Sequence, residues 1–189
     1  MSFNLESGKI TAMIKVGEKI PEFKNLTAYQ AGKFVKLNLD DYKGQWLVLF
    51  FYPRDFTFIC PTEIREFAKL EGEFEKEGAK IVGASTDSEY SHKAWFEKDL
   101  AEVKYPIIAD TNQKLAGGFS CLIWDRGEAL RATYIIDPDQ VLRWLMISDN
   151  AVGRSVKEIL RALKALQTGE LCPVEWQPGE STLGKISNK

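Results

Sequence analysis

Trp46-Leu-Val-Leu-Phe-Phe-Tyr52 is the stretch that decides the fold, because every residue in it is apolar or aromatic. A continuous apolar run of this length is typical of a central strand that is covered on both faces of its sheet. A loop that starts at Pro53 follows, and from Pro61 to about Lys76 the apolar residues recur at helical spacing. This succession of buried strand, loop and helix predicts an α/β layer fold.

Strands and helices continue to alternate on both sides of this stretch. The predicted elements, in chain order, are strands 35–39 and 46–52, helix 61–76, strand 80–86, helix 88–100, strand 105–109, helix 113–118, strands 130–136 and 141–147, and helix 155–168. After Gly169 the chain is rich in glycine and proline and poor in apolar residues. We therefore expect an irregular tail that packs on the body or on a partner subunit.

The bulk composition excludes several classes of function. A chain of 189 residues with a net charge of −2 offers no broad basic surface, so we expect no nucleic-acid partner and no binding to anionic membranes. Its longest apolar stretch, Trp46 to Tyr52, is too short to span a bilayer. Residues 1–14 lack the charged segment and long apolar run of a signal peptide. These features predict a cytoplasmic protein.

Cys60, Cys121 and Cys172 are the three cysteines of the chain. Their spacing matches neither a zinc site nor a disulfide-rich scaffold, and His92 is the only histidine, so we expect no metal. Polar neighbours on both sides of His92 predict that its imidazole is exposed. The interpretations that remain for the cysteines are thiol chemistry or inert burial.

Cys60 stands directly before the predicted helix, in which Pro61 takes the first position. At the N-cap, the free N–H groups and the positive end of the helix dipole favour a reactive thiolate. Thr57 and Thr62 are near enough in sequence for their hydroxyls to donate hydrogen bonds to the sulfur or to an incoming oxygen. On the residues alone, a nucleophilic thiol and an inert buried thiol both stay open.

A family resemblance extends this interpretation. The segment Pro53-Arg-Asp-Phe-Thr57-Phe-Ile-Cys60 fits the P-x-x-x-T-x-x-C signature of the peroxiredoxins. Over nearly its whole length, the chain resembles their typical two-cysteine class, of the alkyl hydroperoxide reductase C type. The resemblance implies a thioredoxin-like α/β fold, with a central mixed β-sheet flanked by helices and an irregular C-terminal tail. It also implies a thiol-dependent peroxidase that reduces hydrogen peroxide and organic hydroperoxides without a cofactor.

The resemblance also implies a role for each residue of the signature. Cys60 matches the cysteine that attacks the peroxide and becomes a sulfenic acid. Thr57 matches the residue whose hydroxyl forms hydrogen bonds with the peroxide oxygens, and Pro53 matches the residue that shields the pocket from water.

Three charged residues match the family as well. Arg131 matches the arginine that stabilises the thiolate and polarises the peroxide, and a cation beside a thiolate favours the ionised form. Glu63 and Arg154 match a supporting pair that orients Arg131. For this pair, surface charges without a role remain the alternative.

The same resemblance assigns residues 1–168 to the peroxidase domain and residues 169–189 to a tail that carries the resolving cysteine, Cys172. That cysteine would form a disulfide with Cys60 of a neighbouring subunit, which implies a homodimer and, in the family, a decamer built as a ring of five dimers. Cys121 is interpreted as a structural thiol. The electron donor is thioredoxin or a flavin disulfide reductase, and the residues do not decide between them.

Two other functions compete with this one. A thioredoxin-like disulfide oxidoreductase needs a second cysteine three residues from the first, and Thr57 and Glu63 occupy those positions. A redox-regulated chaperone or signalling scaffold with the same fold is the alternative from a different class. It would still hold client proteins after Cys60→Ser had abolished peroxide reduction.

Overall fold

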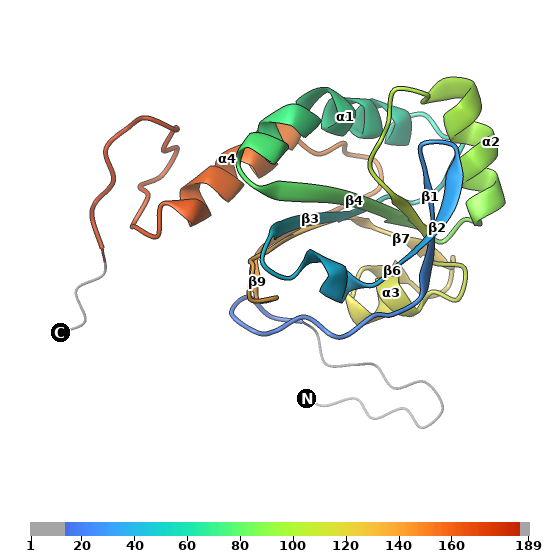
Figure 1. Ribbon diagram of the computed structural model, residues 1–189, viewed down its shortest axis with the longest axis horizontal. Helices are drawn as coiled ribbons and strands as arrows, with labels where there is room; N and C mark the ends of the chain where they lie inside the picture. Colours follow the sequence, from blue (N-terminus) through green and yellow to red (C-terminus); the bar gives the residue numbers. More distant parts are fainter. Residues whose placement is uncertain (1–13, 186–189) are drawn as a thin grey trace. The chain divides into compact units, whose positions relative to one another are not determined.

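The computed structural model describes residues 14–185, coloured along the chain in Figure 1. The chain divides into two compact units at the bond between Arg154 and Ser155. The boundary that we predict after residue 168 separates the peroxidase domain from the tail that carries the resolving cysteine, and it stays a prediction. The predicted absence of a signal peptide concerns residues 1–14, nearly all of which lie outside the described residues. Within 14–185, no helix has the length and apolar character needed to cross a membrane.

The first unit is built around a seven-stranded sheet with the order β2-β1-β5-β4-β3-β8-β9. Its strands are β1 (Leu26–Gln30), β2 (Lys33–Leu37), β3 (Trp46–Phe51), β4 (Ala79–Ser85), β5 (Ile107–Ala109), β8 (Arg131–Ile136) and β9 (Leu142–Ser148). The central strand β3 runs parallel to β4 and antiparallel to β8, and β4 also runs parallel to β5. The sheet is therefore mixed, as predicted.

Helices cover both faces of this sheet (Figure 1). One face carries α1 (Cys60–Lys76) and α2 (Glu89–Asp99). The other face carries a short 3₁₀ helix (Leu39–Tyr42), α3 (Lys114–Gly118) and a small hairpin of β6 (Leu122–Ile123) with β7 (Glu128–Ala129). This arrangement is the predicted thioredoxin-like α/β fold.

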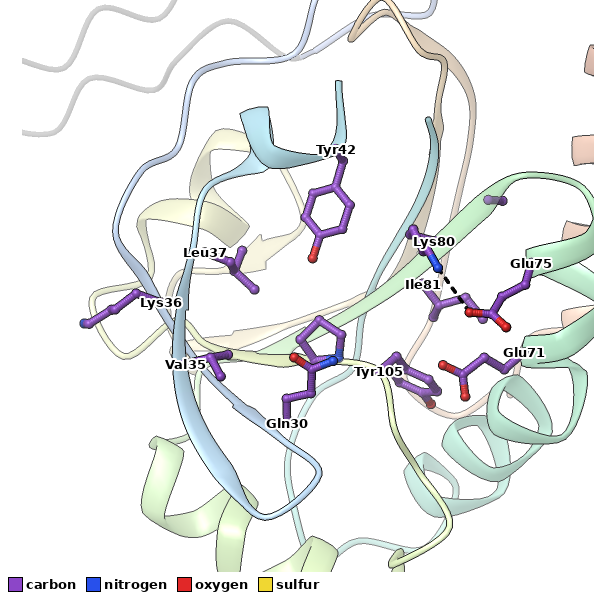
Figure 2. A pocket seen from close by; sticks show the side chains of 12 residues that line it. Gln30, Val35, Lys36, Leu37, Tyr42, Glu71, Glu75, Lys80, Ile81 and Tyr105 are labelled. Carbon is purple, nitrogen blue, oxygen red and sulfur yellow. Dashed lines mark hydrogen bonds and ion pairs between the residues drawn. The ribbon is translucent and has the colours of Figure 1, made fainter. Parts of the chain in front are cut away.

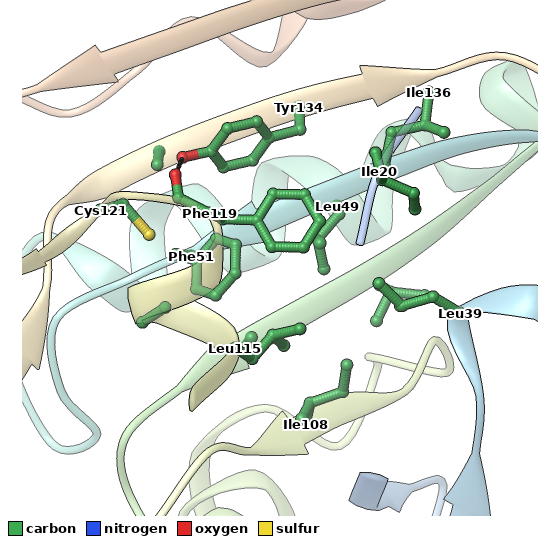
Figure 3. Close-up of a cluster of buried hydrophobic side chains, with 14 of the residues drawn as sticks. Ile20, Leu39, Leu49, Phe51, Ile108, Leu115, Phe119, Cys121, Tyr134 and Ile136 are labelled. Atoms are coloured by element: carbon green, nitrogen blue, oxygen red, sulfur yellow. Dashed lines mark hydrogen bonds between the residues drawn. The ribbon is translucent and has the colours of Figure 1, made fainter. Parts of the chain in front are cut away.

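All but the last residue of the apolar run 46–52 form β3, and alternate side chains of this strand point to the two faces of the sheet. Phe50 stacks on Phe67 of α1, with the ring centroids 4.2 Å apart. Leu49 and Phe51 point the other way, into a buried cluster with Phe119 and further apolar side chains (Figure 3). Because β3 is covered on both sides, each of its positions favours an apolar residue. The loop after β3 thus starts from the buried end of this strand.

The second unit consists of α4 (Val156–Gln167) and the irregular segment after it. Ser155 is the N-cap of α4, where its side chain accepts a hydrogen bond from the backbone N–H of Glu158 at 3.2 Å. Arg161 of α4 donates to the backbone oxygen of Trp176 at 3.1 Å. The predicted irregular tail is therefore connected to its own preceding helix.

The predicted elements are present, with ends that shift by a few residues. The differences are extra elements: strand β1, the 3₁₀ helix and the β6–β7 hairpin were not predicted. These segments are short, and they lack the long periodic pattern on which the predictions depend.

Candidate active site

Cys60 is the first residue of α1, and its side chain is fully buried. The N-cap is Ile59, so the helix begins one residue earlier than predicted and includes the cysteine. Pro61 follows in the first turn, where its missing N–H costs no helical hydrogen bond. The thiol therefore lies within the first turn of the helix, at the end where the dipole favours a negative charge.

Arg131 brings a positive charge to this sulfur. It is the first residue of β8, which pairs with β3, and its Nη1 lies 3.4 Å from Sγ of Cys60. The same Nη1 donates to Oε2 of Glu63 at 2.7 Å. Its Nε donates to the backbone oxygen of Asn150 at 3.0 Å, so the guanidinium is fixed from two sides.

Glu63 and Arg154 form the support beneath Arg131. Both side chains are almost completely buried, so the alternative that they are surface charges is wrong. Oε1 of Glu63 accepts hydrogen bonds from the backbone N–H and from Nε of Arg154, at 2.8 and 2.9 Å. Arg154 also donates to the backbone oxygens of Phe51 and Ala132, at 2.6 and 2.7 Å. The ion pairs thereby connect α1 to strands β3 and β8.

The carboxyl group of Glu63 is ionised in this setting. Burial alone would raise its pKa, but hydrogen bonds from Arg154 and the charges of Arg154 and Arg131 outweigh that effect, and the pKa is lowered. A permanent carboxylate is therefore available to hold the Arg131 guanidinium beside the sulfur.

The two threonine hydroxyls near Cys60 are used differently from our expectation. Thr57 donates its hydroxyl hydrogen to the backbone oxygen of Arg54 at 3.0 Å, and Thr62 donates to the backbone oxygen of Ile59 at 2.6 Å. A hydroxyl has a single hydrogen, so neither threonine donates to the sulfur in this arrangement, and donation to an incoming oxygen stays a prediction. The lone pairs of the Thr57 oxygen stay available as acceptors.

A pocket of about 270 Å³ lies over this arrangement. It is lined by Pro53, Arg54, Thr57, Phe58, Ile59, Glu128, Arg131 and Asn150. Three of the residues predicted from the signature and the resemblance, Pro53, Thr57 and Arg131, thus face the same cavity.

The loop that carries Pro53 and Thr57 is anchored from behind by a buried polar network. Asp55 accepts a hydrogen bond from the Tyr52 hydroxyl at 2.8 Å, and its Oδ2 lies 2.8 Å from Nδ1 of His92. The His92 side chain is completely buried, so the prediction of an exposed imidazole is wrong. Its helical spacing to Trp95 and Phe96 was the missed signal, because residues at i, i+3 and i+4 share one face.

Cys121 lies away from this pocket, in the buried cluster on the other face of the sheet (Figure 3). It is close to Tyr134, whose hydroxyl donates to the backbone oxygen of Phe119. Burial raises the pKa of the Cys121 thiol to about 12, and the negative charge of Asp110 adds to this shift. The environment of Cys121 is that of an unreactive thiol.

Cys172 belongs to the second unit, in the segment after α4, and is half-buried. Its Sγ lies 3.5 Å from the Thr168 hydroxyl and 3.7 Å from the backbone oxygen of Ala165. Cys172 forms no disulfide with another cysteine of the described residues.

A larger pocket, of about 310 Å³, lies elsewhere in the first unit (Figure 2). Glu71, Glu75 and Lys80 line it together with Tyr42 and Tyr105, and Lys80 forms an ion pair with Glu75 at 3.1 Å. The smaller pocket is the candidate active site, because Arg131, which lines it, lies 3.4 Å from Sγ of Cys60. No group of three or more His, Cys, Asp or Glu side chains within residues 14–185 is arranged to hold a metal ion.

Comparison with known proteins gives a consistent result. Residues 16–145 match the AhpC/TSA family. Peroxiredoxin prdx-2 of Caenorhabditis elegans is 45% identical over 177 residues, which cover 89% of this chain and 88% of that protein. The mitochondrial thioredoxin-dependent peroxide reductase of Drosophila melanogaster is 41% identical over 179 residues, which cover 90% of this chain and 76% of that protein.

A solved structure agrees with these relatives. The reduced 2-Cys peroxiredoxin of Plasmodium vivax has a TM-score of 0.85 against this chain at 33% identity, and the match covers 88% of this chain and 91% of that one. The resemblance drawn from the signature is thus confirmed by the family match, the relatives and the fold. The chain belongs to the AhpC/TSA family and is a peroxiredoxin.

Proposed function

We propose that this thiol-dependent peroxidase reduces hydrogen peroxide and organic hydroperoxides at Cys60. The observation that carries the proposal is the guanidinium of Arg131, fixed 3.4 Å from a buried sulfur at the first turn of α1. A thiolate that is stabilised by a cation, and that lies beside a pocket, is the arrangement that peroxide reduction needs.

In the first step the Cys60 thiolate attacks the terminal oxygen of a hydroperoxide, R–O–O–H. The S–O bond forms while the O–O bond breaks, so the sulfur is oxidised to a sulfenic acid and the peroxide is reduced. The leaving oxygen takes up a proton and departs as water or as an alcohol. Arg131 stabilises the thiolate before the attack and the charge that develops on the peroxide oxygens during it.

Thr57 and Pro53 position the substrate. Because the Thr57 hydroxyl donates to the backbone oxygen of Arg54, its lone pairs can accept a hydrogen bond from the O–H of the hydroperoxide. Pro53 lines the pocket without offering an N–H, which limits the water that can compete with the substrate. Glu63 and Arg154 act through Arg131 and serve as positioning residues.

In the second step the thiol of Cys172 attacks the sulfenic acid, so a disulfide forms and water is released. A disulfide requires Cα atoms within about 7 Å, and Cys60 is fully buried in a helical turn. We therefore expect the first turn of α1 to unwind before the bond forms. Hydrogen exchange tests this step: equal protection of residues 58–64 in the reduced and disulfide forms would contradict it.

The partner thiol comes from a neighbouring subunit in this proposal, which makes a homodimer the smallest complete enzyme, with a decamer of five dimers as the larger assembly. A dithiol protein then reduces the disulfide and restores both thiols. The name of the Drosophila relative supports thioredoxin as this donor, with a flavin disulfide reductase as the other candidate. A cytoplasmic location belongs to the same proposal.

Stopped-flow tryptophan fluorescence of the reduced protein mixed with hydrogen peroxide tests the cycle. Trp95 reports on the site, because its ring packs 5.7 Å from that of Phe56 in the loop and 6.2 Å from that of Tyr52. We expect a fast first phase in the wild type, no reaction in Cys60→Ser, and a first phase without the second in Cys172→Ser. A wild-type reaction no faster than that of free cysteine would overturn the proposal.

A further inference from the structure

A cluster of three charged side chains, Arg54, Arg126 and Glu128, stands at the rim of the Cys60 pocket. Nε of Arg54 lies 2.9 Å from Oε2 of Glu128, and Nε of Arg126 lies 3.2 Å from Oε1 of the same carboxylate. Arg54 also donates from Nη2 to the backbone oxygen of Arg126 at 2.9 Å. These contacts join the loop before Cys60 to the β6–β7 hairpin.

This rim cluster is continuous with the reacting centre. Arg54 and Glu128 line the same pocket as Thr57 and Arg131. Asn150 forms the link, because its Nδ2 donates to Oε1 of Glu128 at 3.4 Å while its backbone oxygen accepts from Nε of Arg131 at 3.0 Å. A substrate that enters this pocket therefore lies beside the cluster.

The cluster carries a surplus of positive charge on its outer side. Two guanidiniums share one carboxylate, so its net charge is +1. The Glu128 side chain is only 11% exposed, whereas those of Arg54 and Arg126 are 48% and 59% exposed. An incoming molecule meets the cations before it meets the carboxylate.

Arg54 keeps donors for a further ligand. A guanidinium has five N–H groups, and the hydrogen bonds from Arg54 to Glu128 and to the backbone of Arg126 engage Nε and one N–H of Nη2. The planar fork of the remaining N–H groups matches the geometry of a carboxylate. The same pocket also has apolar lining, to which Pro53, Phe58 and Ile59 contribute.

We propose that Arg54 is a specificity-determining residue, which makes this peroxidase favour hydroperoxides that carry a carboxylate near the peroxy group. Such a substrate places its O–O–H group at Cys60, its short carbon skeleton along the wall of Phe58 and Ile59, and its carboxylate at Arg54. Glu128 holds Arg54 in place and also limits the preference, because its own negative charge repels the substrate carboxylate. This inference rests on the proposed attack of Cys60 on the peroxide.

The test uses two hydroperoxides of the same shape, 3-hydroperoxy-3-methylbutanoate and its primary amide. The measured quantity is the ratio of their second-order rate constants for oxidation of Cys60 in the full-length reduced protein at low ionic strength. We expect the wild type to favour the carboxylate by about threefold, the size of effect that one half-exposed charge supplies. The preference should shrink as salt is added.

Two variants in the same contact should shift this ratio in opposite directions. Arg54→Met removes the cation, so the ratio should fall towards one. Glu128→Gln removes the repelling charge and leaves both arginines, so the ratio should rise by a further factor of about three. Arg143→Met is the matched control: Arg143 is a half-exposed arginine of β9 that pairs with Asp137, and its loss should leave the ratio unchanged.

The outcomes separate this inference from the proposed function. Equal rates for carboxylate and amide in the wild type would overturn the role of Arg54, even if hydrogen peroxide still oxidised Cys60 rapidly. A ratio that fell in both Arg54→Met and Glu128→Gln would overturn it too, because it would mean that the cluster only holds the loop. A wild type that failed to react rapidly with hydrogen peroxide would instead overturn the peroxidase proposal itself.

Discussion

Cys60 and Cys121 are both fully buried thiols of the first unit, yet the structure gives them opposite surroundings. Cys60 lies at the N-terminal turn of α1, with the Arg131 guanidinium 3.4 Å away and a pocket above it. Cys121 lies in the apolar cluster, beside Phe119 and Tyr134 (Figure 3). Burial alone therefore does not distinguish Cys60, the thiol that we propose to be reactive, from Cys121.

The difference is in what accompanies burial. In an apolar cluster a thiolate loses its hydration and finds no cation or hydrogen-bond donor in return, so the neutral thiol is favoured. Beside a fixed cation the thiolate gains a charge-assisted hydrogen bond, and it keeps the low-polarity surroundings in which that bond is strong.

We expect the largest effect in the chemical reactivity of the two thiols, compared in two proteins that each keep a single cysteine. In Cys60→Ser/Cys172→Ser the remaining thiol is Cys121, whose pKa is raised to about 12. At pH 8 only about one thiol in 10⁴ is then ionised, so iodoacetamide should label it at least about a thousandfold more slowly than free cysteine. The rate should rise about tenfold for each pH unit for as long as the protein stays folded.

The comparison protein is Cys121→Ser/Cys172→Ser, in which the remaining thiol is Cys60. It should be oxidised by hydrogen peroxide while the Cys121 protein is not, as judged by the intact mass after brief exposure. Labelling of native Cys121 at the rate of free cysteine would contradict the contrast between the two sites.

The second effect comes from removing the cation. Arg131→Met takes away the donor beside Sγ of Cys60 and leaves the carboxylate of Glu63 paired with Arg154. We expect the rate of oxidation by hydrogen peroxide to fall by about a hundredfold or more, as is found for single groups that stabilise a developing charge. Stopped-flow fluorescence measures the rate, with Arg143→Met as the control for loss of an arginine elsewhere. A loss of less than about fivefold would show that the guanidinium is not what distinguishes Cys60.

The contrast between the two thiols also shows how far the sequence alone leads. The apolar run of β3 and the helical spacing after Pro61 predict the strand–loop–helix junction, because local periodicity decides those elements. The same residues do not predict that Arg131 reaches Cys60. That contact spans 71 positions and depends on β8 pairing with β3. It was expected from family resemblance alone.

Other features of the site could not be predicted from the sequence, because they also depend on contacts between distant residues. His92 has polar neighbours in sequence, so it was predicted to be exposed, but the helix turns it inward to Asp55. The rim cluster joins Arg54 to Glu128, 74 positions away, through a hairpin that was not predicted. Charged residues carry little information about their partners in a single sequence, because most of them are solvated.

The third prediction concerns the pH dependence of stability at the Cys60 site. Glu63 has a lowered pKa in the folded protein, so its ionised form contributes stability that is present above the unfolded pKa, near 4.5, and is lost as pH falls through the folded pKa. Glu63→Gln leaves Arg131 and Arg154 buried without their carboxylate. The free energy of unfolding at pH 7 should then fall by about 3–5 kcal/mol.

Urea unfolding of the wild type and of Glu63→Gln at several pH values measures this contribution. The gap between the two proteins should be constant above pH 5 and should narrow as the pH falls below 4.5. A gap that stayed constant down to pH 3 would mean that the ionised carboxylate is not its source. Glu66→Gln, which removes a more exposed carboxylate of the same helix, is the control.

We expect the smallest effect from replacing two buried tyrosines, one near each thiol. The Tyr52 hydroxyl donates to Asp55 in the loop that precedes Cys60, and the Tyr134 hydroxyl donates to Phe119 beside Cys121. Tyr52→Phe also removes a 3.4 Å contact with Nδ1 of His92, and Tyr134→Phe removes a bond to a backbone oxygen, so each variant should lose about 1–3 kcal/mol of unfolding free energy in urea. Only Tyr52→Phe should also slow the oxidation of Cys60, by a few fold, because it loosens the loop that carries Pro53 and Thr57. If both variants slowed Cys60 equally, the reactivity of the site would depend on the stability of the whole unit and not on the anchoring of its loop.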